Sequence, residues 1–226
     1  IEVVTGDIRD SYFCKEITKD VDIIFHLAAL IAIPYSYIAP ESYLDTNIKG
    51  TLNICQAAKE NGNIRIIHVS TSEVYGSTID NSTVGTSLSE NSVSHSSLLS
   101  PRTPYSVSKK MGEEIVRSFV RKGNSGCSIR FFNVVGPNMD RTVQGYGRVI
   151  PNFVDSIIQN KPLTIYGDGL QTRCFLWIQD AVSALLKLID FSEDIPTVVN
   201  IGHSQQTSIL DLARLFNEIS GIPKEL

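Results

Sequence analysis

The sequence lacks the features that mark several classes of protein. Lys and Arg number 20 against 24 Asp and Glu, and no stretch concentrates positive charge, which argues against a nucleic-acid-binding protein. The longest apolar run, residues 23–33, is interrupted by His26 and is far shorter than the ~18 residues that a membrane-spanning helix needs. No signal-peptide pattern is visible. We therefore expect neither a nucleic-acid partner nor a membrane partner.

Cysteine is scarce and widely spaced. The four cysteines are Cys14, Cys55, Cys127 and Cys174. They form no CxxC pair and no metal-ligand spacing, so they indicate reduced thiols in a cytoplasmic protein and no metal site. At 226 residues and 42% hydrophobic composition, the chain can bury a substantial core. We expect a globular protein, neither disordered nor held together by disulfides.

Short apolar runs alternate with longer amphipathic ones along the chain. Expected strands cover residues 1–5, 23–27, 64–70 and 128–132, and expected helices cover residues 40–60, 104–122, 149–159, 179–189 and 208–219. Pro40 and Pro104 stand in first helical turns, and Gly62 and Gly123 follow helix ends, where left-handed caps are favoured. Because the strands are apolar throughout and alternate with helices, the sequence predicts an α/β fold with a doubly wound parallel sheet.

Two stretches interrupt this alternation. Residues 77–100 are rich in serine and show little periodicity, which predicts a long surface loop. Asn81 begins a glycosylation-like tripeptide there, which we interpret as a chance match. Residues 136–168 are rich in Gly, Pro and Asn around one expected helix. They indicate a smaller, irregular region on the substrate side.

Tyr105 and Lys109 are spaced for one face of a helix. Residues four apart lie one turn above each other. A free phenol, with a pKa of about 10, is a poor base at neutral pH, but a lysine cation one turn away favours the phenolate. The phenolate can then take a proton from a sugar or alcohol hydroxyl. An exposed helical pair without function gives the same spacing, so the pattern alone is weak.

Polar side chains also follow the expected strands. Ser70, Thr71, Ser72 and Glu73 end the strand at 64–70, at the edge where open α/β sheets place ligands. The hydroxyls could bond a substrate oxygen and Glu73 could act as a second acid or base; alternatively, these residues cap a helix. Upstream, Asp7 could accept a hydrogen bond from an adenine amino group or could occupy a turn. His26 is better explained as a packed core residue than as a ligand.

A series of motifs resembles the extended short-chain dehydrogenase/reductase family, in its nucleotide-sugar epimerase/dehydratase branch. The motifs are residues 6–10 (GDIRD), 25–29 (FHLAA), 45–51 (DTNIKGT), 70–76 (STSEVYG), 105–109 (YSVSK), 130–137 (RFFNVVGP) and 166–173 (YGDGLQTR). Their order and spacing span nearly the whole chain. The resemblance implies a Rossmann sheet that carries tightly held NAD, in preference to NADP, and a nucleotide-diphosphate sugar as substrate.

The resemblance also implies roles for single residues. Tyr105 would remove the proton of the sugar C4 hydroxyl while hydride passes to the nicotinamide, Lys109 would tune Tyr105 and hold the nicotinamide ribose, and Thr71 would bond the same sugar oxygen. The implied catalytic set is Thr71, Ser72, Glu73, Tyr105 and Lys109, and the implied cofactor-binding set is Asp7, Ile8, Leu27, Ala28, Ala29, Ser70, Tyr105 and Lys109. Asn133 and Arg173 would hold the substrate diphosphate, which suits the fork of an arginine.

Glu73 bears on the step that follows the 4-keto intermediate. In this family simple C4 epimerases usually have a small or apolar residue at that position, whereas 4,6-dehydratases and UDP-glucuronate decarboxylases commonly carry Thr-Ser-Glu. In a dehydratase Glu73 could remove the C5 proton while water leaves from C6. Residues 27–37 are similar to 4,6-dehydratases acting on N-acetylhexosamine nucleotides, but residues 101–109 and 171–175 resemble decarboxylases and epimerases equally well. We favour a 4,6-dehydratase, with a UDP-glucuronate decarboxylase or a C4 epimerase as the alternatives.

Two other functions fit the fold but not the residues. A reductase of small alcohols or ketones would not need Asn133 and Arg173, which suit a diphosphate. A non-catalytic dinucleotide-sensing scaffold would be expected to have lost Tyr105 or Lys109, and this chain has both. The leading hypothesis therefore remains a nucleotide-sugar enzyme that regenerates its cofactor in each turnover.

The sequence has no GxxGxxG after a strand, the loop that brings backbone N–H groups to a pyrophosphate. In the resembled family that loop precedes the motif at 6–10 by roughly fifty residues, about one strand–helix–strand unit. We therefore expect a fragment without the N-terminal βαβ unit, with residues 1–135 as a truncated dinucleotide-binding core, completed by parts of 170–202. Residues 136–226 would be mainly substrate-binding. Family members often dimerise through the helices that begin here at Pro40 and Pro104, so we expect a homodimer.

Overall fold

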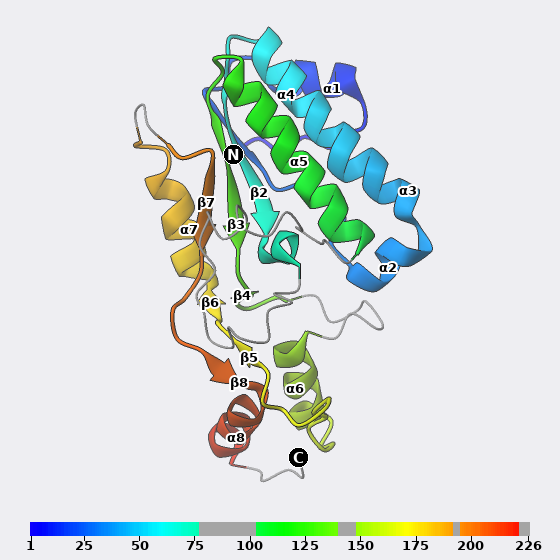
Figure 1. Ribbon diagram of the computed structural model, residues 1–226, viewed down its shortest axis with the longest axis vertical. Coiled ribbons are helices and arrows are strands. Elements are labelled where there is room, and N and C mark those ends of the chain that lie inside the picture. The colour runs from blue at the N-terminus through cyan, green and yellow to red at the C-terminus, as the bar shows by residue number, and fades with distance from the viewer. Residues whose placement is uncertain (77–102, 140–147, 192–194, 222–226) are drawn as a thin grey trace. The chain divides into compact units, whose positions relative to one another are not determined.

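The computed structural model describes residues 1–76, 103–139, 148–191 and 195–221 (Figure 1). The chain divides into two compact units. Unit 1 comprises Ile1–Phe131 and Leu186–Ile201, and unit 2 comprises Phe132–Leu185 and Gly202–Leu226. The loop predicted at 77–100, with Asn81, lies outside the described residues.

A four-stranded parallel sheet forms the centre of unit 1. Its strands are, in spatial order, β1 (Ile23–His26), β2 (Arg65–Thr71), β3 (Gly126–Phe131) and β7 (Val198–Ile201). In register, Ile66 of β2 lies between Ile24 of β1 and Gly126 of β3. Parallel neighbours need crossover connections, and α4 and α5 are the crossovers from β1 to β2 and from β2 to β3. The predicted α/β class with a parallel sheet is thus confirmed.

The helices expected over 40–60 and 104–122 in unit 1 begin and end within one residue of the predicted bounds. The helices of unit 1 are α1 (Ser11–Ile17), α2 (Ile33–Ile38), α3 (Pro40–Tyr43), the π-helical η1 (Leu44–Lys49), α4 (Gly50–Glu60), the 3₁₀-helical η2 (Ser72–Tyr75) and α5 (Pro104–Arg121). The helix expected over 40–60 is present as α3, η1 and α4 in series. Gly62 and Gly123 have φ of +109° and +86°, which confirms the left-handed caps. The sequence analysis missed α1 and α2.

The strand predicted for residues 1–5 is wrong. The segment has no regular secondary structure, and its Val3 side chain is 88% exposed. An extended apolar segment becomes a strand only when its backbone N–H and C=O groups pair with a neighbour. None of the strands in the described part of the chain pairs with residues 1–5. Composition alone therefore over-predicted this element.

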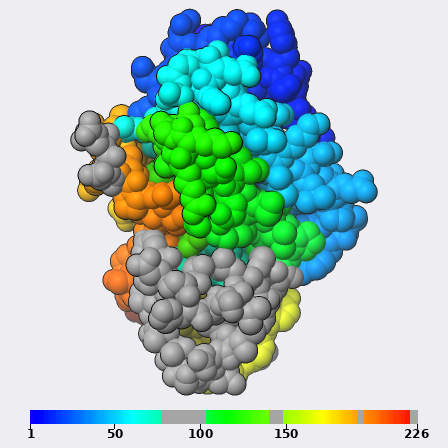
Figure 2. All heavy atoms as spheres, turned by 45° about the horizontal axis from the view of Figure 1, so that its top comes forward, coloured from blue at the N-terminus to red at the C-terminus, as the bar shows by residue number. Residues whose placement is uncertain are grey.

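The core of unit 1 lies between the sheet and its helices. It consists of Cys14, Ile54, Cys55, Ala57, Ala58, Ile64, Ile66, Val116 and Phe119. The helices α4 and α5 pack against each other and against β2, and Figure 2 shows α5 (green) beside the blue-to-cyan segment that leads through α4. All four cysteines are free thiols, as their spacing predicts.

Unit 2 is built from shorter elements around a core of its own. It contains β4 (Val134–Val135) paired with β6 (Leu176–Trp177), and β5 (Thr172–Arg173) paired with β8 (Thr207–Ser208). Its helices are α6 (Val149–Ile158), most of α7 (Ile178–Lys187) and α8 (Ile209–Ser220). The core consists of Phe153, Leu163, Ile209, Leu212 and Ala213. The three helices predicted here are confirmed to within two residues at each end.

No helix within the described ranges has the length and apolar character needed to cross a bilayer.

Candidate active site at the carboxyl end of the sheet

The first turn of α5 is firmly capped. Thr103 Oγ1 accepts the backbone N–H of Ser106 at 3.0 Å, and Ser106 Oγ accepts that of Thr103 at 3.1 Å, a reciprocal capping box. Pro104 occupies the turn where proline is pre-shaped for a helix. Tyr105 and Lys109 follow and are only 8% and 5% exposed. The alternative of an exposed helical pair is therefore wrong.

Lys109 ties α5 to the end of β2. Its Nζ donates a hydrogen bond to the carbonyl oxygen of Val69, just before the polar residues that end the strand. Burial lowers the pKa of Lys109 to about 8, and the negative charge of Glu113 opposes that shift. At pH 7 the amine is still mostly protonated. It therefore carries a positive charge close to the carboxyl end of β2.

Two buried histidines share this part of the core with Lys109. The rings of His26 and His68 lie 5.6 Å apart, with His26 Nε2 2.9 Å from Thr51 Oγ1 and His68 Nδ1 3.3 Å from Ser128 Oγ. Burial, helped by the charge of Lys109, lowers the pKa of His26 to about 4 and that of His68 well below its usual value. Both rings are neutral at pH 7, and the prediction that His26 is a packed core residue is confirmed.

The residues that end β2 divide between burial and exposure. Ser70 is buried and donates to Glu113 Oε1 at 2.7 Å, whereas Thr71 and Ser72 are half-buried and Glu73 is exposed. Thr71 Oγ1 caps η2 by accepting the backbone N–H of Glu73 at 3.2 Å. A hydroxyl that accepts one hydrogen bond still carries a donor proton. The capping interpretation is confirmed for Thr71, and it leaves Thr71 able to donate to a ligand.

The residues predicted on the adenine side lie next to α1 and α4. Arg9 Nε lies 3.0 and 2.9 Å from the two carboxylate oxygens of Asp7. These bonds lower the pKa of Asp7 to about 2. Ile8 is half-buried, and its carbonyl accepts from Asn53 Nδ2 at 2.9 Å. A Cβ at Gly50 would come within 2.4 Å of Ile8 Cδ1, so the close approach of α4 requires that glycine.

The segment after β1 is held by a residue to which the sequence had assigned no role. Leu27 and Ala28 are exposed and Ala29 is half-buried. Beyond them, Asn47 bonds both backbone groups of Leu30: its Oδ1 accepts the N–H at 2.8 Å, and its Nδ2 donates to the carbonyl at 2.9 Å.

The same amide connects that segment to α5. Asn47 Nδ2 also lies 2.9 Å from Ser108 Oγ, and Ser108 in turn donates to the carbonyl of Tyr105 at 2.7 Å. Asn47 sits in the π-helical η1, an irregularity frequent at functional sites. The sequence could not indicate this role, because an amide within a helix stands out only once its burial is known.

The predicted diphosphate residues lie in unit 2. Asn133 has a left-handed backbone with φ of +37°, and its Nδ2 donates to the carbonyl of Cys174 at 3.0 Å. Arg173, which precedes Cys174 in the chain, is exposed in β5 and donates through Nη1 to the carbonyl of Thr172 at 2.8 Å. Asn133, just before β4, is thus bonded to the residue that directly follows Arg173 in the chain.

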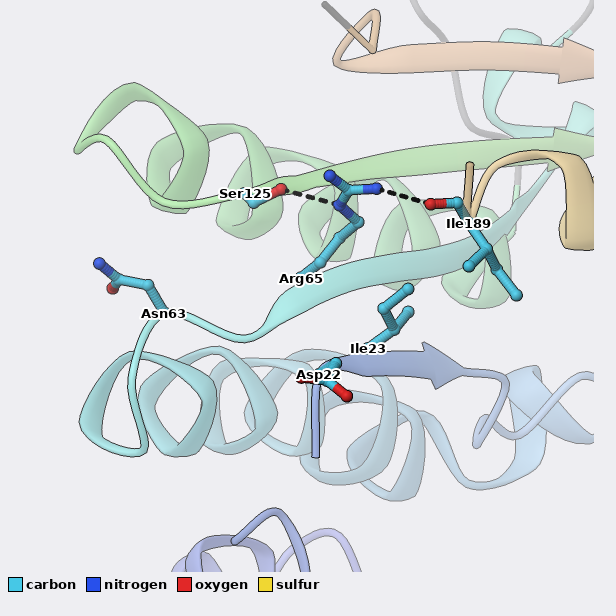
Figure 3. A pocket seen from close by; sticks show the side chains of 6 residues that line it. All are labelled: Asp22, Ile23, Asn63, Arg65, Ser125 and Ile189. Atoms are coloured by element: carbon cyan, nitrogen blue, oxygen red, sulfur yellow. Dashed lines mark hydrogen bonds between the residues drawn. The ribbon is translucent and has the colours of Figure 1, made fainter. Parts of the chain in front are cut away.

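A pocket of about 370 Å³ opens at the opposite edge of the sheet of unit 1, where β1 and β2 begin (Figure 3). It contains none of the predicted site residues. Arg65 fills part of it, donating from Nε to Ser125 Oγ at 3.1 Å and from Nη1 to the carbonyl of Ile189 at 3.2 Å. Because this guanidinium is already engaged, the candidate active site remains at the carboxyl edge. Among the described residues, no cluster of His, Cys, Asp or Glu could hold a metal ion.

Comparison with known proteins connects this geometry to one family, whose model, the NAD dependent epimerase/dehydratase family, matches residues 1–202. A UDP-N-acetyl-alpha-D-glucosaminuronate decarboxylase of Bacillus cytotoxicus is 31% identical over 221 residues, which cover 97% of this chain and 66% of the relative. A dTDP-D-glucose 4,6-dehydratase of Dictyostelium discoideum is 34% identical over 220 residues, covering 95% of this chain and 49% of the relative.

A solved structure extends the comparison to a third reaction. The UDP-N-acetylglucosamine 4-epimerase from Methanobrevibacter ruminantium, in complex with UDP-N-acetylmuramic acid, superimposes with a TM-score of 0.87 at 30% identity, covering 99% of this chain and 68% of that structure. The chain spans between about half and two thirds of the length of the curated relatives named above. With its α/β sheet and these matches, the chain belongs to the NAD dependent epimerase/dehydratase family.

Proposed function

We propose that this chain forms the catalytic part of an NAD-dependent nucleotide-sugar enzyme that works through a 4-keto-sugar intermediate. The observation that carries the proposal is the capped, buried turn of α5, which places Tyr105 and Lys109 in the core of unit 1 and ties Lys109 to the end of β2. A functionless surface pair would not be buried in this way. The family match supports the same reaction class.

The proposed chemistry begins with proton removal. Tyr105, as a phenolate, takes the proton of the sugar C4 hydroxyl, Lys109 stabilises the phenolate through its charge, and Thr71 donates a hydrogen bond to the same sugar oxygen. When bound, NAD supplies the acceptor for the C4 hydride. Leu27, 58% exposed at the end of β1, offers an apolar contact for that cofactor. The proposed cofactor contacts are Asp7, Ile8, Leu27, Ala28, Ala29, Ser70, Tyr105 and Lys109.

For the step after oxidation we propose a 4,6-dehydratase. Glu73, exposed in η2 just after β2, is available to remove the C5 proton that the ketone makes acidic while the C6 hydroxyl leaves, the two departing as water, and Ser72 would assist beside it. The hydride taken from C4 would then return to C6, so that the net change is the loss of water. In unit 2, Asn133 and Arg173 would hold the diphosphate of the substrate. The relatives include a decarboxylase and an epimerase, so these two reactions are the alternatives. We also propose that the protein is a homodimer and is located in the cytoplasm.

The test is to incubate the purified protein with UDP-, dTDP- and GDP-sugars and to measure the masses of the products by mass spectrometry. Loss of water identifies a dehydratase, loss of carbon dioxide a decarboxylase, and an isomer of unchanged mass an epimerase. Glu73→Gln should still oxidise C4 but should not complete the later step; equal loss of both steps would contradict the role of Glu73. If wild type converts no nucleotide sugar and Tyr105→Phe behaves identically, the proposed function is wrong.

A further inference from the structure

A fully buried ion pair lies behind the candidate active site. Glu113 of α5 and Arg130 of β3 are each 1% exposed. Arg130 Nε donates to Glu113 Oε1 at 2.8 Å and Nη2 donates to Oε2 at 2.7 Å, a two-pronged contact. Ser70 adds a bond to Oε1 at 2.7 Å, and Lys110 adds one to Oε2 at 3.2 Å. Each carboxylate oxygen thus accepts two donors.

This contact extends to the other elements that form the site. The guanidinium carbon of Arg130 lies 4.7 Å from the centre of the Tyr75 ring, in η2. The Tyr75 hydroxyl donates to Asn200 Oδ1 in β7 at 2.8 Å. The ion pair and its partners therefore connect α5, η2 and three adjacent strands.

Stability alone does not explain such a pair. The cost of removing two charges from water can exceed their attraction, and well-packed apolar residues often serve equally well. Burial by itself would raise the pKa of Glu113, but the hydrogen bonds and charge of Arg130, with help from Ser70 and Lys110, outweigh burial and lower it. The carboxylate stays charged, and its geometry stays fixed. A specific geometric role accounts for both observations.

The position of the pair indicates that role. Glu113 lies one helical turn after Lys109, on the same face of α5. Ser70, which donates a hydrogen bond to the Glu113 carboxylate, immediately precedes Thr71 in β2. The carboxylate thus joins the helix that carries the proposed base to the strand that carries the proposed hydroxyl donor.

We propose that Glu113 and Arg130 are positioning residues, which hold α5 against β2 and β3 so that Tyr105 and Lys109 keep a fixed relation to Thr71. This inference rests on the proposed function for its catalytic consequence. In this proposal neither side chain contacts substrate or cofactor.

The kinetic test compares Glu113→Gln with Val116→Ala. Glutamine keeps the shape but removes the charge, and we expect kcat to fall about 100-fold, since misplacement of reacting groups by about 1 Å has that effect, while KM changes less than about threefold. Val116 lies one turn further along the same helix, is 0% exposed, and belongs to the apolar core and not to the ion pair. Its truncation should lower stability but leave kcat near that of wild type. Equal losses of kcat in the two variants would overturn the proposal.

A double variant separates positioning from folding. Glu113→Leu combined with Arg130→Leu removes both charges together, so it avoids an unpaired buried charge and should recover much of the thermal stability that either single change loses. We expect its kcat to remain about 100-fold low, because no directional contact then joins α5 to Ser70. Recovery of kcat together with stability would show that the pair only supports folding.

Hydrogen–deuterium exchange tests the positioning without relying on activity. Glu113→Gln should accelerate exchange in peptides covering residues 70–76 and 103–112. Val116 shares its apolar core with Ile66, near the start of β2, so Val116→Ala should leave residues 70–76 as in wild type. Unchanged exchange in Glu113→Gln would overturn the proposal. If wild type converts no nucleotide sugar, the proposed function fails while the exchange measurement still decides whether the pair positions the helix.

Discussion

The two units hold their proposed functional side chains in different ways. In unit 1, Tyr105 and Lys109 are buried, and a capping box and the Lys109–Val69 hydrogen bond hold them. In unit 2, Arg173 is exposed in a strand of two residues. A group that transfers a proton needs a fixed position and a tuned pKa, which the interior provides. A group that only grips a diphosphate can act from an exposed element.

The sharpest test of this contrast is a change in the reacting group. Tyr105→Phe should lower kcat about 10²–10⁴-fold, because the base is lost. The ring would still pack edge-on against Tyr43, at 6.4 Å between centroids, so the melting temperature should stay close to that of wild type. Steady-state kinetics with the identified sugar nucleotide and a thermal melt provide the measurement.

The matched change in unit 2 is Arg173→Gln, which should raise KM more than it lowers kcat, because it weakens binding of the ground state and the transition state alike. If Arg173→Gln abolished kcat while Tyr105→Phe kept it, the contrast between the units would be reversed.

A second prediction concerns stability. Arg130→Met leaves the Glu113 carboxylate buried without its main partner, which should cost about 3–5 kcal/mol in the free energy of unfolding. Trp177, the single tryptophan, lies in unit 2, so its fluorescence reports that unit while far-UV circular dichroism reports both. Urea unfolding should show an earlier circular-dichroism transition and a less affected fluorescence transition. A loss below about 1 kcal/mol would argue that the pair is poorly formed.

A third prediction is a dependence on pH that originates in unit 1. The pKa of His26 is about 4 in the folded state against 6.5 ordinarily, so between these values the unfolded chain binds a proton that the native chain does not. Stability should therefore fall as the pH is lowered from 6.5 to 4, by on the order of 3 kcal/mol from this residue. His68 acts in the same direction. His26→Gln should flatten the dependence in urea titrations at several pH values; an unchanged slope would contradict the assignment.

The smallest expected effect comes from matched helix caps. Thr103 caps α5 in unit 1 and Ser208 caps α8 in unit 2. Replacing either with alanine should cost about 1 kcal/mol of stability. Only Thr103→Ala should also lower kcat, by a few-fold, because the turn it caps carries Tyr105. Similar kinetic losses in both variants would remove the distinction between the two units.

Local signals predicted much of the fold. The prolines at 40 and 104 and the glycines at 62 and 123 marked helix ends correctly, since capping and φ preferences act within a few residues. The strand expected at 1–5 failed because a strand depends on a partner elsewhere in the chain. The helix α1 was missed for a different reason. It has a cap at Asp10, but its seven residues are too few to show a clear helical periodicity.

The sequence by itself determined the family motifs and the helix that carries Tyr105 and Lys109, because these follow from the order of residues and from helical spacing. Only the tertiary structure decided that both side chains are buried and that Asn47 holds Leu30 and Ser108. It alone also paired Glu113 with Arg130. The physical reason is that desolvation and hydrogen bonds between distant residues arise only when separate elements pack together, as Asn47 and Ser108 do across 61 positions.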